Sequence, residues 1–242
     1  LAAQALAARE AAGTLDHEAA RTLLRQQIEA LPYVVSAWTL DRQGRVQYHS
    51  DQVSADVDQS ARDYFKIYRT RPGTDFYLSN PSRETPSSPW QVRASRPLSG
   101  PDGQFNGAIA AAVDPLYFDK LWHALADEPG IAVSLLRTDG TMMLRSPIND
   151  PAMGRNFSSG PLFKQYLPTQ PTGGLDLASP LDGSARFVAY RTLVNRSDLV
   201  ILIGRTKQAI LAPWRNMALL ALIAWVIASL AIAASAAYFS RL

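Results

Sequence analysis

The sequence predicts an α+β protein of two small tandem domains, each with an antiparallel sheet, followed by a helix that crosses a membrane. The second half repeats the order of elements of the first, and neither half alternates strands and helices as doubly wound folds do. Residues 217–238, MALLALIAWVIASLAIAASAAY, contain no charge. At 242 residues the chain is long enough for two domains that each bury a core.

The uncharged run is long enough to cross a membrane as one helix. At about 1.5 Å per residue it spans roughly 33 Å, and the hydrocarbon core of a bilayer is about 30 Å thick. A buried helix of a soluble protein is the alternative, but such helices rarely stay apolar on all sides for this length. We therefore expect residues 213–242 to contain a transmembrane helix and the start of the cytoplasmic side. Because the sequence stops at Leu242, we expect it to be a fragment of a longer protein.

Residues 1–32 are expected to form a helical stalk. They are rich in Ala, Leu, Gln, Glu and Arg, which favour helices. The opening LAAQALAA lacks the basic residues of a signal peptide and resembles the end of a preceding helix. A helix at each end suggests a pair of domains held between two membrane spans.

The first domain is expected at 33–126. Two strands around an Asp-Arg-Gln-Gly turn form a hairpin, and a loop with four prolines separates a helix from a second pair of strands. A further helix follows, with Asp114 as its cap and Pro115 in its first turn. The expected elements are strands at 33–40, 45–50, 76–78, 90–98 and 105–113 and a helix at 54–70.

The second domain is expected at 127–212 and follows the same plan. Its hairpin turns at Asp139-Gly140, and a serine closes the second strand of each hairpin, Ser50 in one and Ser146 in the other. A final helix is expected to begin near Thr206 and to continue into the membrane. The expected strands are 131–137, 141–146, 174–178, 185–191 and 199–204, with a short helix within 149–168.

Composition and motifs argue against several functions. The net charge of +3 forms no basic block, so nucleic-acid binding has little support. The chain has no cysteine, and its three histidines have no ligand spacing, so we expect no metal or other cofactor. Neither a Gly-x-Ser-x-Gly elbow nor a phosphate-binding loop is present. We expect no catalytic site in this part of the protein.

Two clusters of aromatic and cationic residues favour small-molecule binding. They lie at 62–65, Arg-Asp-Tyr-Phe, and at 90–96, Trp-Gln-Val-Arg-Ala-Ser-Arg. Guanidinium groups pair with carboxylates, and aromatic walls exclude water from a pocket. Because neighbours in a strand face opposite ways, only one of Arg93 and Arg96 should face a given cavity. The alternative is that the aromatic residues are core and the arginines are solvated.

The same segments resemble a known family. The run from Arg62-Asp-Tyr-Phe through the Pro/Ser-rich loop to 92–96 and 102–114 resembles the membrane-distal module of double Cache sensor domains, which are PAS-like extracytoplasmic domains of bacterial receptors. The segments 186–193, 199–204 and 210–215 are similar to the membrane-proximal module. The resemblance covers nearly the whole chain and explains its internal repeat.

The resemblance implies a transmembrane receptor with residues 1–212 in the periplasm, in the bacterial inner membrane. A cytoplasmic diguanylate cyclase or histidine kinase domain would follow, and the receptor would be a homodimer. Ligand would bind in the distal module. A dimerising or protein-docking ectodomain without a ligand is the competing interpretation.

The resemblance also implies ligand-binding residues. Arg62, Tyr64 and Phe65 occupy the positions of an Arg-x-Trp-Tyr segment in amino-acid-binding members, and Asp114 matches the acidic residue that ends the last strand. Tyr64 replaces the tryptophan, and the Tyr-x-Asp segment of those members has no match in 77–92. The expected ligand is therefore a carboxylate or an amino-acid-like metabolite. The full set of expected ligand contacts is Arg62, Tyr64, Phe65, Tyr77, Trp90, Arg93, Arg96 and Asp114.

Overall fold

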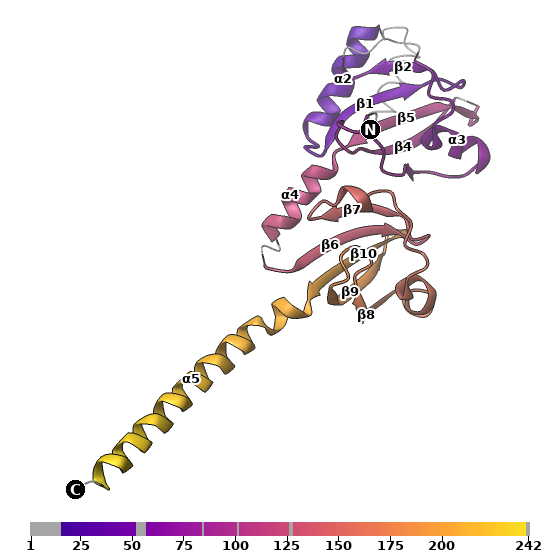
Figure 1. Ribbon diagram of the computed structural model, residues 1–242. Coiled ribbons are helices and arrows are strands. Elements are labelled where there is room, and N and C mark those ends of the chain that lie inside the picture. Colours follow the sequence, from indigo (N-terminus) through magenta and orange to yellow (C-terminus); the bar gives the residue numbers. More distant parts are fainter. Residues whose placement is uncertain (1–15, 52–56, 84, 101, 126–127, 241–242) are drawn as a thin grey trace.

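The computed structural model describes residues 16–51, 57–83, 85–100, 102–125 and 128–240 (Figure 1). Two five-stranded antiparallel sheets lie one after the other along the molecule, joined by helix α4, and a long helix, α5, leaves the second sheet. The fold class predicted from the sequence, α+β with two tandem modules and a C-terminal apolar helix, is confirmed. The expected domain limits stay a prediction.

The first module contains the sheet of order β2-β1-β5-β4-β3. Sequence-adjacent strands are not all neighbours, because β5 inserts between β1 and β4. Its elements are α2 (His17–Glu29), β1 (Val34–Leu40), β2 (Val46–His49), α3 (Asp63–Thr70), β3 (Tyr77–Leu78), β4 (Val92–Ser99) and β5 (Phe105–Val113).

The second module repeats this topology as β7-β6-β10-β9-β8. Each strand therefore has a counterpart in the first module, β6 for β1 and β10 for β5. The elements are α4 (Pro115–Leu125), β6 (Ile131–Arg137), β7 (Met142–Ser146), a 3-10 turn η1 (Asp150–Ala152), a π-helical turn η2 (Leu162–Tyr166), β8 (Thr172–Ala178), β9 (Ala185–Leu193), β10 (Arg196–Thr206) and α5 (Lys207–Phe239).

The first sheet has a different cover on each face. Helix α2 packs Ala20 and Leu24 against Ala37 on one face. Trp38, the next residue of β1, faces the other side, where helix α3 contributes Tyr64 and Phe65 to the core. This alternation follows from the two-residue period of a strand. The sheet therefore separates α2 from the α3 side.

The first helices differ from the expectation. Asp16 caps α2 by accepting a hydrogen bond from the Ala19 N–H at 2.7 Å, and residues 1–15 of the expected stalk lie outside the described part. Residues 54–56 of the helix expected at 54–70 lie outside the described part, and from residue 57 on only α3 is helical. Upstream of it, Asp58 bridges to Arg45 and accepts a hydrogen bond from the Ser60 N–H, which favours a turn over a helix.

The two modules share a hydrophobic cluster. Val92 of the first module packs with Met143, Leu144 and Leu199 of the second, and α4 adds the rings of Phe118 and Trp122, among other partly buried residues. The modules therefore contact each other directly as well as through α4.

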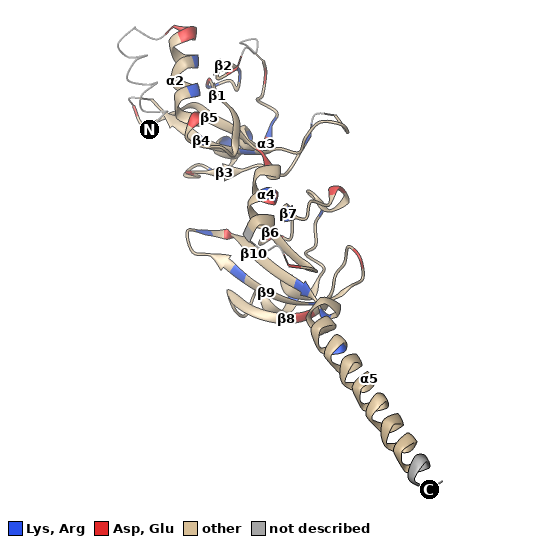
Figure 2. Ribbon diagram, turned by 90° about the vertical axis from the view of Figure 1, so that its left-hand side faces the viewer, with Lys and Arg blue, Asp and Glu red and all other residues tan. Residues whose placement is uncertain are grey.

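Helix α5 begins where β10 ends. Thr206 accepts a hydrogen bond from the Ala209 N–H at 3.3 Å and donates its own N–H to the Gly130 carbonyl at 3.1 Å. Lys207 pairs with Asp176 at 3.0 Å. Residues Lys207–Ala236 are long and apolar enough to cross a membrane, with a mean hydropathy of 2.5 and no burial in the most apolar window. Charge is confined to the start of this helix (Figure 2).

Candidate functional site

The first module holds an open cavity of about 360 Å³ on the face of its sheet opposite α2. Its floor comes from β1, β2, β4 and β5, and one side comes from the segment that leads into α3. The lining residues are Val35, Ser36, Trp38, Val46, His49, Asp51, Val57, Gln59, Arg62, Tyr64, Gln91, Arg93 and Ala112.

Arg93 brings a positive charge to the cavity floor. Antiparallel pairing aligns Arg93 with Ala112 and Ala112 with Ser36, so the three residues share one face. The Arg93 side chain is only 9% exposed, and its guanidinium donates to the Ser82 hydroxyl. No carboxylate among the described residues forms an ion pair with it. A buried guanidinium without a carboxylate partner is suited to an anionic ligand.

Tyr64, Gln59 and Arg62 form the polar side of the cavity. The Tyr64 hydroxyl donates to Gln59 Oε1 at 3.0 Å, and Arg62 Nε donates to the same oxygen at 3.3 Å. Burial raises the pKa of Tyr64, and the charges of Arg93 and Arg62 oppose that rise. Tyr64 is therefore a neutral hydroxyl at physiological pH. Arg62, which immediately precedes α3, is exposed at the mouth of the cavity.

Trp38 supplies an aromatic wall. Its ring stacks on His49 with the centroids 5.6 Å apart and the planes 7° apart. The residue is 6% exposed, and its indole N–H is covered beside the Tyr64 hydroxyl, without a hydrogen bond of normal geometry among the described residues.

Asp51 and His49 lie side by side in the cavity lining. The Asp51 N–H donates to His49 Nδ1 at 2.9 Å. Burial lowers the pKa of His49 below 6.5, and the Asp51 carboxylate only partly opposes the shift. His49 is therefore a neutral ring at neutral pH, and Asp51 is the one carboxylate among the described lining residues. The cavity thus presents two cations and one anion.

The family model of dCache_1-like histidine kinase sensor domains matches residues 115–204, which cover α4 and most of the second module. The extracellular domain of rpHK1S-Z16, a protein assigned as a histidine kinase, shares 27% identity over 88% of this chain and 85% of that chain, with a TM-score of 0.75. The chain has the double Cache sensor fold. The resemblance noted in the sequence is confirmed.

Two chemoreceptor domains share the double Cache fold at lower identity. The ligand-binding domain of Pseudomonas fluorescens CtaA, in complex with L-alanine, is 15% identical over 86% of this chain and 85% of that chain, with a TM-score of 0.62. The domain of Pseudomonas aeruginosa PctB, in complex with L-Arg, is 18% identical over 86% and 83%, also with a TM-score of 0.62. A search of curated proteins finds no significant match.

Three of the eight expected ligand contacts of this double Cache chain line the first-module cavity, namely Arg62, Tyr64 and Arg93. The open choice between two arginines is answered by the register of β4. Arg93 faces the cavity, whereas Arg96 is exposed and lies over the Phe76 ring at 5.5 Å. Contact of the three residues with a ligand stays a prediction.

Phe65 and Asp114 have structural positions instead. Phe65 is fully buried beneath the sheet face, with its ring 5.7 Å from that of Phe105. Asp114 accepts a hydrogen bond from the Leu116 N–H at 2.9 Å and so caps the start of α4. Neither residue lines the cavity.

Tyr77 and Trp90 lie at the junction between the modules. Arg137 of the second module lies over the Tyr77 ring at 5.2 Å and donates to the Leu78 carbonyl. The Trp90 indole N–H donates to Asp150 of the second module at 3.0 Å. Both side chains therefore belong to module contacts and not to the cavity.

Sequence reasoning missed Trp38, His49, Asp51 and Gln59 as lining residues. The strand VVSAWTL is apolar at nearly every position, so its alternation does not reveal which face meets a cavity. Ser36 and Trp38 pair with Ala112 and Ala110 of β5, and this pairing identifies the face of β1 that meets the cavity. The sequence alone does not show which strand lies beside β1, so it could not reveal that face.

Proposed function

We propose that the first-module cavity binds a small carboxylate or amino-acid-like metabolite and that binding is signalled across the membrane. The observation that carries the proposal is the buried Arg93 guanidinium, which faces an open cavity without a carboxylate partner among the described residues. The amino-acid complexes of CtaA and PctB, which share the fold, support the class of ligand.

The charges of the cavity match those of an amino acid. Arg93 and Arg62 would pair with the ligand carboxylate, and the Trp38 ring would form a wall beside it. Asp51 would attract the ammonium group. Val35 and Val57, 52% and 39% exposed at the mouth, would contact an apolar side chain. A ligand without an ammonium group would use the arginines alone.

Signalling would pass through the sheet, from the cavity on one face to α2 on the other. The cavity and α2 lie on opposite faces of the same strands, and the second module meets the first through the cluster around Val92. A ligand that binds one arrangement of these parts better than another shifts their populations. Since α5 follows β10 without a break, a shift in the second module would reach the membrane helix.

The proposed receptor is a homodimer in the bacterial inner membrane, with residues 1–212 in the periplasm. The apolar helix Lys207–Ala236 and the extracellular origin of the similar domain support this orientation. The output domain would be a histidine kinase or a diguanylate cyclase, and the dCache_1-like histidine kinase match favours the kinase.

A thermal-shift screen of the purified 242-residue chain in detergent tests the binding. We expect an amino acid or short carboxylate to raise Tm, by mass action on the folded state. Arg93→Gln should weaken that binding by about tenfold or more, because a charge-assisted hydrogen bond is lost.

Arg96→Gln is the matched control, since Arg96 lies on the same strand and points away from the cavity. It should leave the ligand response unchanged. Equal loss in both variants would contradict the assigned cavity. No response to any amino acid, carboxylate or amine would favour an ectodomain that dimerises or docks a protein without a ligand.

A further inference from the structure

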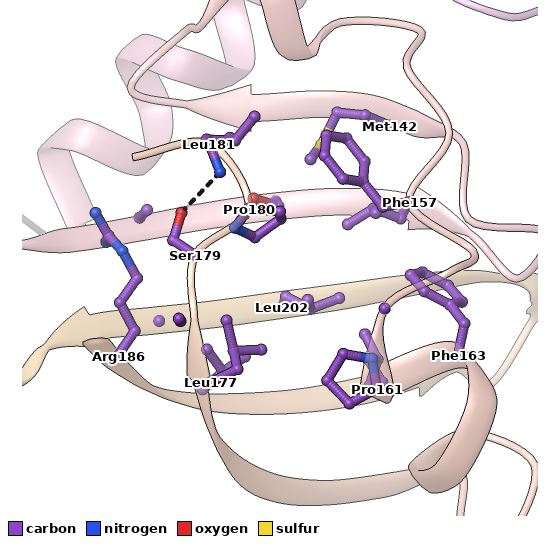
Figure 3. A pocket seen from close by; sticks show the side chains of 18 of the residues that line it. Met142, Phe157, Pro161, Phe163, Leu177, Ser179, Pro180, Leu181, Arg186 and Leu202 are labelled. Atoms are coloured by element: carbon purple, nitrogen blue, oxygen red, sulfur yellow. Dashed lines mark hydrogen bonds between the residues drawn. The ribbon is translucent and has the colours of Figure 1, made fainter. Parts of the chain in front are cut away.

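A second cavity, of about 180 Å³, lies in the second module (Figure 3). It occupies the position equivalent to that of the first cavity, between the sheet and the segments that cover it. The first cavity rests on β1, β2, β4 and β5, and the second on their counterparts β6, β7, β9 and β10, with β8 at its edge.

The register of the strands brings one cationic side chain to this cavity. Ser134 of β6 pairs with Leu202 of β10 and with Arg145 of β7, so the three residues share a face. A register shift between Leu135 and Leu136 also returns Met142 to that face. Arg145 therefore lines the cavity together with Met142.

The remaining walls are almost entirely apolar. Phe157, Pro161 and Phe163 come from the segment before and within η2, and Leu177, Pro180 and Leu181 come from the end of β8 and the turn after it (Figure 3). Such a surface favours a compact hydrocarbon group and disfavours a second charge, because burying an unpaired charge is costly.

Two arginines line the cavity, but only one lacks a carboxylate. Arg186 pairs with Asp182 at 2.9 Å and also donates to the Gly130 carbonyl at 3.2 Å. Arg145 is half-buried and donates to the Ser134 hydroxyl at 3.1 Å. No carboxylate among the described residues forms an ion pair with it.

The environment disfavours the charge that Arg145 carries. Burial lowers the pKa of Arg145, the nearby positive charge of Arg186 lowers it further, and Asp182 only partly opposes the shift. The side chain nevertheless stays protonated at physiological pH, because a guanidinium group is not deprotonated in proteins. An anion bound in the cavity would offset the unfavourable burial of the Arg145 charge and its repulsion by Arg186.

We propose that the second-module cavity is a separate ligand site for a monocarboxylate with a compact apolar group, of the benzoate type. The carboxylate would pair with Arg145, and the ring would fill the apolar part between Phe157 and Leu177. An apolar cavity of roughly 150 Å³ accepts benzene, so about 180 Å³ leaves room for a ring with a small substituent. The site differs from the first cavity, which offers charges of both signs.

The test uses 4-fluorobenzoate and the 242-residue chain in lipid nanodiscs. Broadening of the ¹⁹F resonance, after subtraction of the signal change with empty nanodiscs, reports binding to the protein. We expect broadening that benzoate reverses and benzylamine does not, because Arg145 repels a cation.

Variants assign the binding to this cavity. Arg145→Gln should weaken it by about tenfold or more. Arg191→Gln changes an exposed arginine of β9 that pairs with Ile201, on the sheet face away from the cavity, and should leave binding unchanged. Arg93→Gln should also leave it unchanged, which separates this site from the first cavity. If Arg145→Gln does not fold, Ala132→Leu keeps the charge, fills part of the cavity and should abolish binding.

Three results would overturn the proposal. The first is no broadening beyond that with empty nanodiscs. The second is binding retained in a folded Arg145→Gln or in Ala132→Leu. The third is binding lost in Arg93→Gln, which would assign the compound to the first module.

Discussion

Trp38 and Arg93 are the residues that most distinguish the first cavity from a filled core. Each has a buried polar group that the described residues leave without its preferred partner, an acceptor in normal geometry for the indole N–H and a carboxylate for the guanidinium. Proteins satisfy nearly all buried polar groups. The Arg93 guanidinium, which lines the cavity without a carboxylate partner among the described residues, is best explained by an anionic ligand.

His49 makes the stability of the first module depend on pH. Because burial lowers its pKa below 6.5, the folded state binds a proton less readily than the unfolded state does. Its contribution to stability is complete above about pH 6.5 and is lost as the pH falls towards the lowered pKa. We expect Tm to fall with pH in this window, and His49→Gln to flatten the slope.

Thermal melting of the 242-residue chain between pH 5 and pH 8 measures this dependence. His17→Gln serves as the control, because that imidazole is exposed at the start of α2. A slope that survives in His49→Gln and disappears in His17→Gln would contradict the assignment.

For individual residues, the sequence predicted which types of side chain line the cavity better than it predicted which residues contact one another. Three residues that it proposed as ligand contacts, Arg62, Tyr64 and Arg93, line the cavity, because aromatic and guanidinium groups cluster on two elements; their contact with a ligand stays a prediction. It could not identify Trp90 and Tyr77 as junction residues, since their partners Asp150 and Arg137 lie in another module. Docking between modules depends on contacts that no local pattern contains.

Two hairpins show the internal repeat at the level of elements. Gly44 and Gly140 end equivalent turns with φ of +90° and +93°. Each carbonyl accepts a hydrogen bond from the segment that covers the module, from the Gln59 N–H in one and the Phe157 N–H in the other, both at 2.8 Å. The turn glycine thus anchors the chain that forms one side of each cavity.

Alanine at either turn should destabilise the protein for two reasons. A Cβ would lie 2.7 Å from Ser60 Cα at Gly44 and 2.4 Å from Ser158 N at Gly140. The positive φ alone costs an L-residue about 1–2 kcal/mol, and the backbone contact adds to it. We expect Gly44→Ala and Gly140→Ala each to cost about 3 kcal/mol or more.

Gly73→Ala is the matched control, since Gly73 has φ of +90° and no atom within 4 Å of the added Cβ. It should cost only the conformational part. Thermal melting would contradict the account if all three variants lost the same stability.

Elements with a clear local signal were predicted from the sequence, and those that depend on context were not. The hairpins followed from alternation around Asp-containing turns, and α4 followed from Asp114 and Pro115. Residues 57–62 have helical spacing but pair with the first hairpin, as the Arg45–Asp58 bridge shows. Tertiary pairing overrode the local pattern there.

At the scale of the molecule, each module packs a preceding helix against its second strand. Arg25 of α2 donates to the Ser50 carbonyl at 3.0 Å, and His123 of α4 lies 3.0 Å from the Ser146 hydroxyl. Helix α4 is therefore both the link between the modules and the equivalent of α2 in the second. A change in either cavity would reach a helix in the same way.

The Trp38 indole N–H gives the most direct test of the central claim that the first cavity binds a ligand. In a ¹⁵N-tryptophan-labelled chain in detergent, titration with L-alanine, L-arginine, L-glutamate and succinate would be followed by the indole resonances, assigned by Trp→Phe variants. We predict that at least one compound shifts the Trp38 resonance most, because the Trp38 ring lines the cavity, with a smaller effect on Trp90, which donates to Asp150 at the module junction. The shift should disappear in Arg93→Gln. A Trp38 resonance that no compound moves, or one that still moves in Arg93→Gln, would contradict the account.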